Sequence, residues 1–138
     1  MHATIRTACV TVLLLAASIG GVQAGVVVYD AANVAGNQWR YDYEVTNDNV
    51  AQPLTWFTVF FALGSYAGVC DGDGITGLCG VEPLTPVHWY AFVAQPDPLL
   101  PDNGFFDVST PGTGIARGQT LRGFSVAVSY THLRAHET

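Results

Sequence analysis

Hydrophobic and polar residues alternate along much of the chain with a period of two. In residues 39–46 (WRYDYEVT), one set of alternate positions is aromatic or aliphatic and the other is polar or charged. Strict alternation over eight residues predicts a strand with one face buried and the other in water. Asn47, Asp48 and Asn49 follow, and their turn chemistry predicts that the strand ends there.

A second kind of segment is apolar on both of its alternate sets of positions. Residues 56–63 (WFTVFFAL) predict a central strand that is covered on both faces. A short buried helix is the alternative. The aromatic and β-branched content and the lack of a capping sequence favour the strand.

Four further segments read as short strands: 26–29 (VVVY), 87–94 (VHWYAFVA), 104–108 (GFFDV) and 120–128 (TLRGFSVAV). The connections between them are rich in turn-forming residues, and 95–103 (QPDPLLPDN) contains three prolines. No segment shows sustained helical periodicity. Six short strands with such turns predict an all-β fold, an antiparallel β-sandwich of the jelly-roll or immunoglobulin-like type, with an open β-barrel as the alternative.

The first 24 residues are predicted to be a secretory signal peptide. Arg6 precedes an apolar run over residues 8–19, and small residues at Val22 and Ala24 predict cleavage before Gly25. A membrane-spanning helix needs roughly 20 apolar residues, and this run is shorter. We therefore expect an exported protein of the cell surface or the extracellular space.

The last ten residues, 129–138 (SYTHLRAHET), resemble a translated sequencing-adaptor read-through. We therefore expect this tail to be an artefact and the domain to span residues 25–128. The natural chain would then continue past Val128, and the sandwich would lack its last strand or strands. An incomplete sheet exposes an unpaired edge, which promotes aggregation.

The negative charge of the chain excludes some classes of binding partner. Its net charge is −6, there is no lysine, and region 25–128 holds ten carboxylates against three arginines. Nucleic acids and anionic lipids need clustered cations, so neither is an expected partner. No glycine-rich loop follows a strand and opens a helix, so we expect no nucleotide and no cofactor.

Two cysteines remain after removal of the signal peptide, which takes Cys9 with it. Cys70 and Cys79 enclose the turn-forming residues 71–78 (DGDGITGL), and an oxidising compartment favours a disulfide between them. Closing so short a loop would contribute about 2.5 kcal/mol. A zinc site would need a second pair of ligands, so we favour the disulfide.

Asp71 and Asp73 in that loop are weak candidates for calcium ligands. The pattern lacks an earlier acidic ligand and the closing glutamate of a calcium-binding loop. Alternating Asp and Gly residues are also ordinary hairpin chemistry. We favour the turn and expect no metal.

Catalytic residues are sparse. Asp97, Asp102 and Asp107 could supply a carboxylate pair for glycoside hydrolysis, but aspartates that cap turns are the favoured interpretation. His88 is the single histidine of region 25–128. No serine of this region lies in a nucleophile elbow: Ser65, Ser109 and Ser125. We therefore expect no enzyme.

Strand aromatics offer a further possibility, a flat platform on which sugar rings stack. Trp39, Tyr41 and Tyr43 form the candidate row, because they share one face of a predicted strand. The favoured alternative is that they belong to the core. Joint exposure would favour the platform. The full set considered is Trp39, Tyr41, Tyr43, Trp56, Trp89 and Tyr90.

Three segments, together with the signal peptide, resemble exported bacterial proteins of the PEP-CTERM class: 39–48 (WRYDYEVTND), 95–107 (QPDPLLPDNGFFD) and 114–126 (GIARGQTLRGFSV). The resemblance implies a C-terminal signal processed by an exosortase at the envelope of Gram-negative bacteria. It also implies a link to extracellular polysaccharide and biofilm matrix. The chain carries no such C-terminal signal, which truncation before the tail would explain.

The expected function is that of a non-enzymatic protein of the cell surface or extracellular matrix. A polysaccharide or matrix component is the expected partner, and the membrane would be reached through a C-terminal anchor that this chain lacks. The alternative is a carbohydrate-binding module that uses exposed strand aromatics. A secreted hydrolase is the third possibility, and the sequence favours it least.

Overall fold

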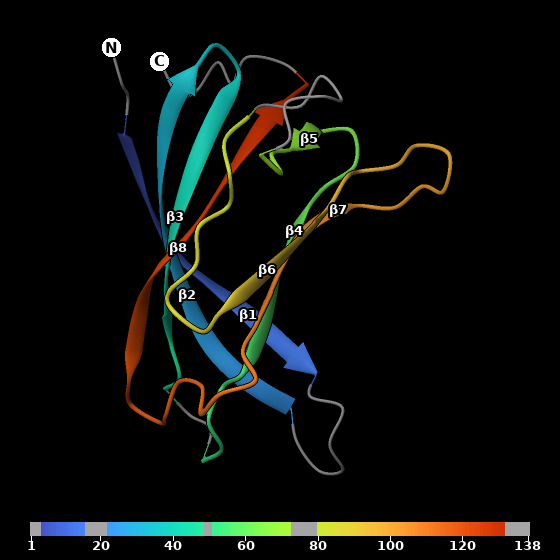
Figure 1. Cartoon of the computed structure of the whole chain (residues 1–138). Coiled ribbons are helices and arrows are strands. Elements are labelled where there is room, and N and C mark those ends of the chain that lie inside the picture. Colours follow the sequence, from blue (N-terminus) through green and yellow to red (C-terminus); the bar gives the residue numbers. More distant parts are fainter. Residues whose placement is uncertain (1–3, 16–21, 49–50, 73–79, 132–138) are drawn as a thin grey trace.

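The computed structural model describes residues 4–15, 22–48, 51–72 and 80–131. These residues form two antiparallel sheets and no helix, so the all-β prediction is confirmed. One sheet has the strand order β1-β2-β3-β8-β5 and the other β4-β7-β6 (Figure 1). The strands are β1 (Thr4–Leu15), β2 (Val22–Ala35), β3 (Gln38–Thr46), β4 (Trp56–Phe61), β5 (Tyr66–Val69), β6 (Tyr90–Ala94), β7 (Gly104–Ser109) and β8 (Thr120–Tyr130).

The alternation of β3 produces the two faces that the sequence predicts. Trp39, Tyr41 and Tyr43 are buried, whereas Arg40 and Asp42 are exposed and form an ion pair at 3.2 Å. The strand is central because it pairs with β2 on one side and β8 on the other. One face of the larger sheet is therefore apolar and the other is wet.

The core lies between the two sheets and contains aromatic rings from both. Tyr43 of β3 stacks on Phe106 of β7 with ring centroids 6.0 Å apart. Phe57 of β4 meets Phe124 of β8 edge-on at 5.0 Å. Rings in this arrangement contribute about 0.5–1.5 kcal/mol per pair beyond the burial of their area. The two sheets therefore share a single hydrophobic core.

Residues 56–61 of the predicted strand 56–63 form a strand, but not a central one. β4 lies at the edge of the three-stranded sheet, where it pairs with β7. Phe57 and Phe61 face the core, while Phe60 on the opposite face is 66 % exposed. The expectation that both faces are covered is wrong, because an apolar pattern does not show whether a second layer packs on each face.

Residues of the predicted signal peptide form strand β1 and the start of β2. β1 pairs with β2 and is the edge strand of the larger sheet. Cleavage before Gly25 would remove β1 and three residues of β2, and would leave the buried Val27 and Ala31 in place. The signal peptide and its cleavage stay predictions. No helix in the described part of the chain is long and apolar enough to cross a membrane.

The C-terminal strand continues past the domain boundary predicted at Val128. Tyr130 is buried, and its N–H donates to the carbonyl of Asn37 at 3.0 Å. The Asn37 side chain donates in turn to the carbonyl of Tyr130 at 2.9 Å. The predicted boundary therefore falls inside β8. Residues 132–138 lie outside the described residues, and the foreign origin of the tail stays a prediction.

Because Tyr43 is buried, we expect the stability of the fold to decrease at alkaline pH. Burial raises its pKa well above the ordinary value, with smaller contributions from Tyr66, Tyr29 and Asp42. In the unfolded chain, a tyrosine side chain loses its proton near pH ~10. Above that pH the folded state still holds the Tyr43 proton that the unfolded state has released, so proton release favours unfolding. The Tyr43 contribution is thus fully present below about pH 10 and is lost as the pH rises further.

We expect Tyr43→Phe to lose less stability than the wild type between about pH 9 and 11. Urea unfolding followed by circular dichroism across this range measures the difference. Tyr90→Phe is the control, because that side chain is 63 % exposed. Parallel pH profiles for Tyr43→Phe and the wild type would contradict the assignment.

Candidate ligand-binding face

The outer face of the three-stranded sheet carries a group of exposed aromatic residues. In β7, Phe106 and Val108 point into the core, so the alternate residues Phe105, Asp107 and Ser109 point outward. The pairing of β4 and β6 with β7 then places nine outward side chains in three rows. The rows are Trp56, Ser109 and Tyr90; Thr58, Asp107 and Phe92; and Phe60, Phe105 and Ala94. We call these residues the outer aromatic face.

Three of the rings are largely open to solvent. Phe60, Tyr90 and Phe92 are 66 %, 63 % and 63 % exposed. Phe105 lies between two of them, with centroids 6.2 Å from Phe60 and 5.9 Å from Phe92. Single exposed apolar residues are common, but a contiguous aromatic group on one sheet face is typical of an interaction site.

A carboxylate lies at the centre of this face. The Trp56 Nε1–H donates to Oδ1 of Asp107 at 2.5 Å, and the Thr58 hydroxyl donates to the same oxygen at 2.6 Å. Oδ2 accepts no hydrogen bond from the residues that the structure describes. The two donors therefore fix the carboxylate and leave one strong acceptor available beside the rings.

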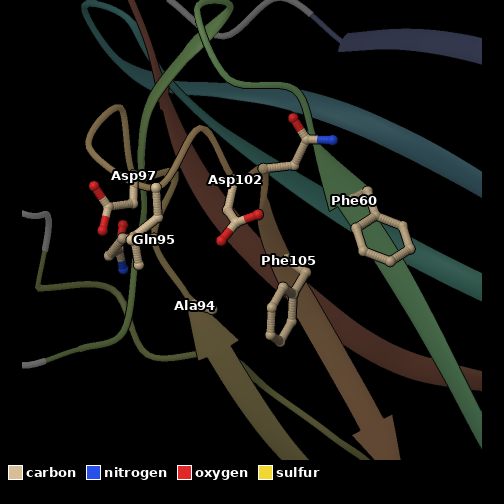
Figure 2. Close-up of a pocket in the computed structure, with 8 residues that line it drawn as sticks. Phe60, Ala94, Gln95, Asp97, Asp102 and Phe105 are labelled. Carbon is tan, nitrogen blue, oxygen red and sulfur yellow. The ribbon is translucent and has the colours of Figure 1, made fainter.

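A cavity of about 490 Å³ adjoins the Phe60–Phe105 end of the face. Its other wall is the hairpin at residues 95–103, closed by backbone hydrogen bonds of 2.9 and 3.0 Å between Asp97 and Asp102. Figure 2 shows the Asp102 carboxylate directed toward the Phe105 ring, while that of Asp97 points away. The Asp97 Oδ1 accepts from the Leu99 N–H at 2.8 Å, which is the turn-capping role expected for it.

The hairpin is fixed to the other sheet by one side chain. The Gln95 Oε1 accepts from the N–H of Val69 at 2.8 Å, and its Nε2 donates to the carbonyl of Val69 at 2.6 Å. This two-point contact replaces a strand neighbour for β5. The wall of the cavity is therefore held in position rather than left as an independent loop.

The platform considered for Trp39, Tyr41 and Tyr43 does not form, and the favoured interpretation, that they belong to the core, is confirmed. Each of the three is 5 % exposed, because their face of β3 packs against the second sheet. Of the wider aromatic set, Trp89 is also in the core, whereas Trp56 and Tyr90 belong to the outer aromatic face. The phenylalanines of this face were not singled out from the sequence: Phe60, Phe92 and Phe105.

The remaining candidates lie elsewhere. His88 is in an exposed turn with φ of 68°, and its carbonyl accepts from the Thr110 hydroxyl at 2.7 Å. Ser125 is buried in β8, where its N–H and carbonyl pair with Leu84. These contacts are structural. That the protein is not an enzyme stays a prediction.

The cysteine loop lies largely outside the described residues. Cys70 is buried, and its N–H donates to the carbonyl of Ala127 at 2.8 Å. Cys79 and Asp73 lie outside the described residues, so the disulfide and the calcium site stay predictions. Within the described part of the chain, no three His, Cys, Asp or Glu residues are grouped so as to hold a metal ion, and Asp71 belongs to no such group.

Comparison with known proteins adds no relative. No family model, curated protein or solved structure matches the chain. The resemblance to the PEP-CTERM class therefore stays an expectation.

Proposed function

We propose that the protein is an exported, non-enzymatic carbohydrate-binding module of the cell surface or extracellular matrix. The observation that carries the proposal is the outer aromatic face, with three exposed rings around an oriented carboxylate. Its export by the signal peptide at residues 1–24 and its attachment through a C-terminal anchor beyond this chain are parts of the same proposal. So is a β-sandwich of the jelly-roll or immunoglobulin-like type.

Sugar rings suit this surface for a physical reason. One face of a pyranose presents C–H groups, which are apolar, while its rim presents hydroxyls. Burying apolar surface against Phe60 or Phe92 gains roughly 25 cal/mol per Å². A hydroxyl that donates to the Asp107 carboxylate makes a hydrogen bond stronger than one between neutral groups.

The arrangement also gives the surface its selectivity for a polar ligand. Asp107 is half-buried, and a dry apolar partner would bury its second oxygen without a donor. An unsatisfied buried acceptor costs about 1–3 kcal/mol, more when it is charged. A ligand that combines apolar faces with many donors avoids this cost, and polysaccharides have that composition.

We expect Phe92→Ala to weaken glycan binding by roughly 1–2 kcal/mol, on the order of 10-fold in Kd, because one exposed stacking surface is lost. Affinity electrophoresis through gels containing neutral, amino and acidic polysaccharides measures the effect. The matched control is Leu84→Ala, since Leu84 is 58 % exposed and pairs with β8 of the other sheet. The proposal would be contradicted if no polysaccharide slowed the migration of the wild-type protein, or if Phe92→Ala and Leu84→Ala lost glycan affinity equally.

A further inference from the structure

We propose that the outer aromatic face selects glycans that carry positive charge, namely polymers of hexosamine with free amino groups. The inference rests on the proposed function and adds the class of ligand. It follows from the sign of the charges around the face. Asp107 lies at its centre, and Asp102 and Asp97 line the cavity at its end.

Three arginines of the described residues lie elsewhere on the molecule, and a fourth, Arg6, is in the edge strand β1 of the larger sheet. Arg40 and Arg122 belong to the larger sheet, where Arg40 pairs with Asp42 at 3.2 Å and Arg122 with Glu44 at 2.9 Å. Arg117 lies in the exposed connection before β8. None of these three arginines is among the residues of the outer aromatic face or its cavity. The local charge is therefore negative, like that of the whole chain.

An ammonium group on a sugar can interact with both the aromatic rings and the carboxylate of this surface. A cation within about 6 Å of an aromatic ring centroid is attracted by the ring, and two exposed rings flank Phe105. The same cation can donate to Oδ2 of Asp107 in a charge-assisted hydrogen bond. Phe105 and Asp107 are alternate residues of β7, so about 7 Å separates them along the strand. A single sugar unit can thus stack and pair at once.

Other occupants fit less well on the same grounds. Uronate or phosphate-bearing polymers would place negative charge beside Asp107 and Asp102. A second copy of the chain, joined face to face by two-fold symmetry, would oppose two sets of identical carboxylates. The charge therefore disfavours both acidic glycans and self-association through this surface.

Titration calorimetry with four oligosaccharides of equal length tests the inference: glucosamine, N-acetylglucosamine, glucose and galacturonate oligomers. N-acetylation removes the positive charge and keeps the ring. We expect the glucosamine oligomer to bind at least about 10-fold more tightly than its acetylated form, with a preference that shrinks as salt is added.

Asp107→Asn should abolish this preference. Its Oδ1 can still accept from Trp56 and Thr58, so the fold is expected to persist, which thermal unfolding checks. Asp102→Asn, outside the strands, should reduce the preference in part. Asp42→Asn removes an equal charge from the opposite side of the molecule and should leave the preference intact.

The outcomes distinguish a failure of charge selection from a failure of the proposed glycan binding. Equal affinity for the glucosamine and N-acetylglucosamine oligomers would overturn charge selection while leaving glycan binding in place. Tightest binding of the galacturonate oligomer would overturn it as well. Failure of all four to bind would count against the proposed function itself. A dimer in sedimentation that Phe92→Ala dissociates would replace the glycan with a second copy of the chain.

Discussion

Replacing Phe124 with alanine is expected to lower the free energy of unfolding by about 3–5 kcal/mol. Phe124 is 1 % exposed and joins the two sheets. It extends from β8 to contact Phe57 in β4 and Trp89 just before β6. It meets Phe57 edge-on at 5.0 Å and Trp89 edge-on at 5.2 Å. Truncation removes both contacts and leaves a cavity that two sheets of fixed geometry cannot close.

Urea denaturation followed by tryptophan fluorescence measures this loss. A domain of this size is stable by roughly 5–15 kcal/mol, so the variant would retain only part of its stability. Phe60→Ala removes the same side chain from an exposed position and should cost much less. A loss below about 1 kcal/mol in Phe124→Ala would show that the two sheets do not depend on this contact.

Substituting aspartate for Asn47 is expected to cost about 3–5 kcal/mol at neutral pH. Asn47 is fully buried, and its Nδ2 donates to the carbonyls of Gln52 and Ile115, both at 2.9 Å. Its backbone carbonyl accepts from the N–H of Gly118 at 2.6 Å, so the residue joins the β3–β4 connection to the β7–β8 connection at one end of the core. Aspartate has the same shape, but it would direct a carboxylate oxygen at two carbonyl oxygens.

The pH dependence of Asn47→Asp distinguishes charge from shape. Burial and the carbonyl oxygens favour the protonated acid, so the pKa of the introduced group should be higher in the folded than in the unfolded state. The folded state then binds more protons, and lost stability returns as the pH falls. Asn33→Asp is the control, because Asn33 also donates to two carbonyls but is partly exposed. A pH-independent loss at Asn47 would contradict this explanation.

The sequence identifies the strands better than it identifies their environment. Alternation in residues 39–46 correctly assigns the two faces of β3, because its polar set marks the wet side. The outward residues of β4 and β6 carry no such mark: Phe60 and Phe92 are as apolar as the core residues beside them. Only the pairing of these strands in a small sheet with one uncovered side shows that the rings are exposed.

Two other features depend on contacts between distant segments. β5 has four residues, including Gly68, and gives no periodic pattern; it forms because β8 offers an unpaired edge. Ala127 is fully buried on the polar side of β8 because Cys70 and Val81 cover it. Such coverage by a loop has no local signature in the sequence, and neither does the cavity that the 95–103 hairpin builds against Phe105.

The central claim, that the outer aromatic face binds glycan, is tested most directly by nuclear magnetic resonance. Backbone amide shifts are recorded while the tightest-binding oligosaccharide is added to the isotope-labelled protein. The account predicts saturable shifts concentrated in Trp56–Phe61, Tyr90–Ala94 and Gly104–Ser109. Shifts concentrated instead on the outer side of β2 and β3, or no saturable shift with any glycan, would contradict it.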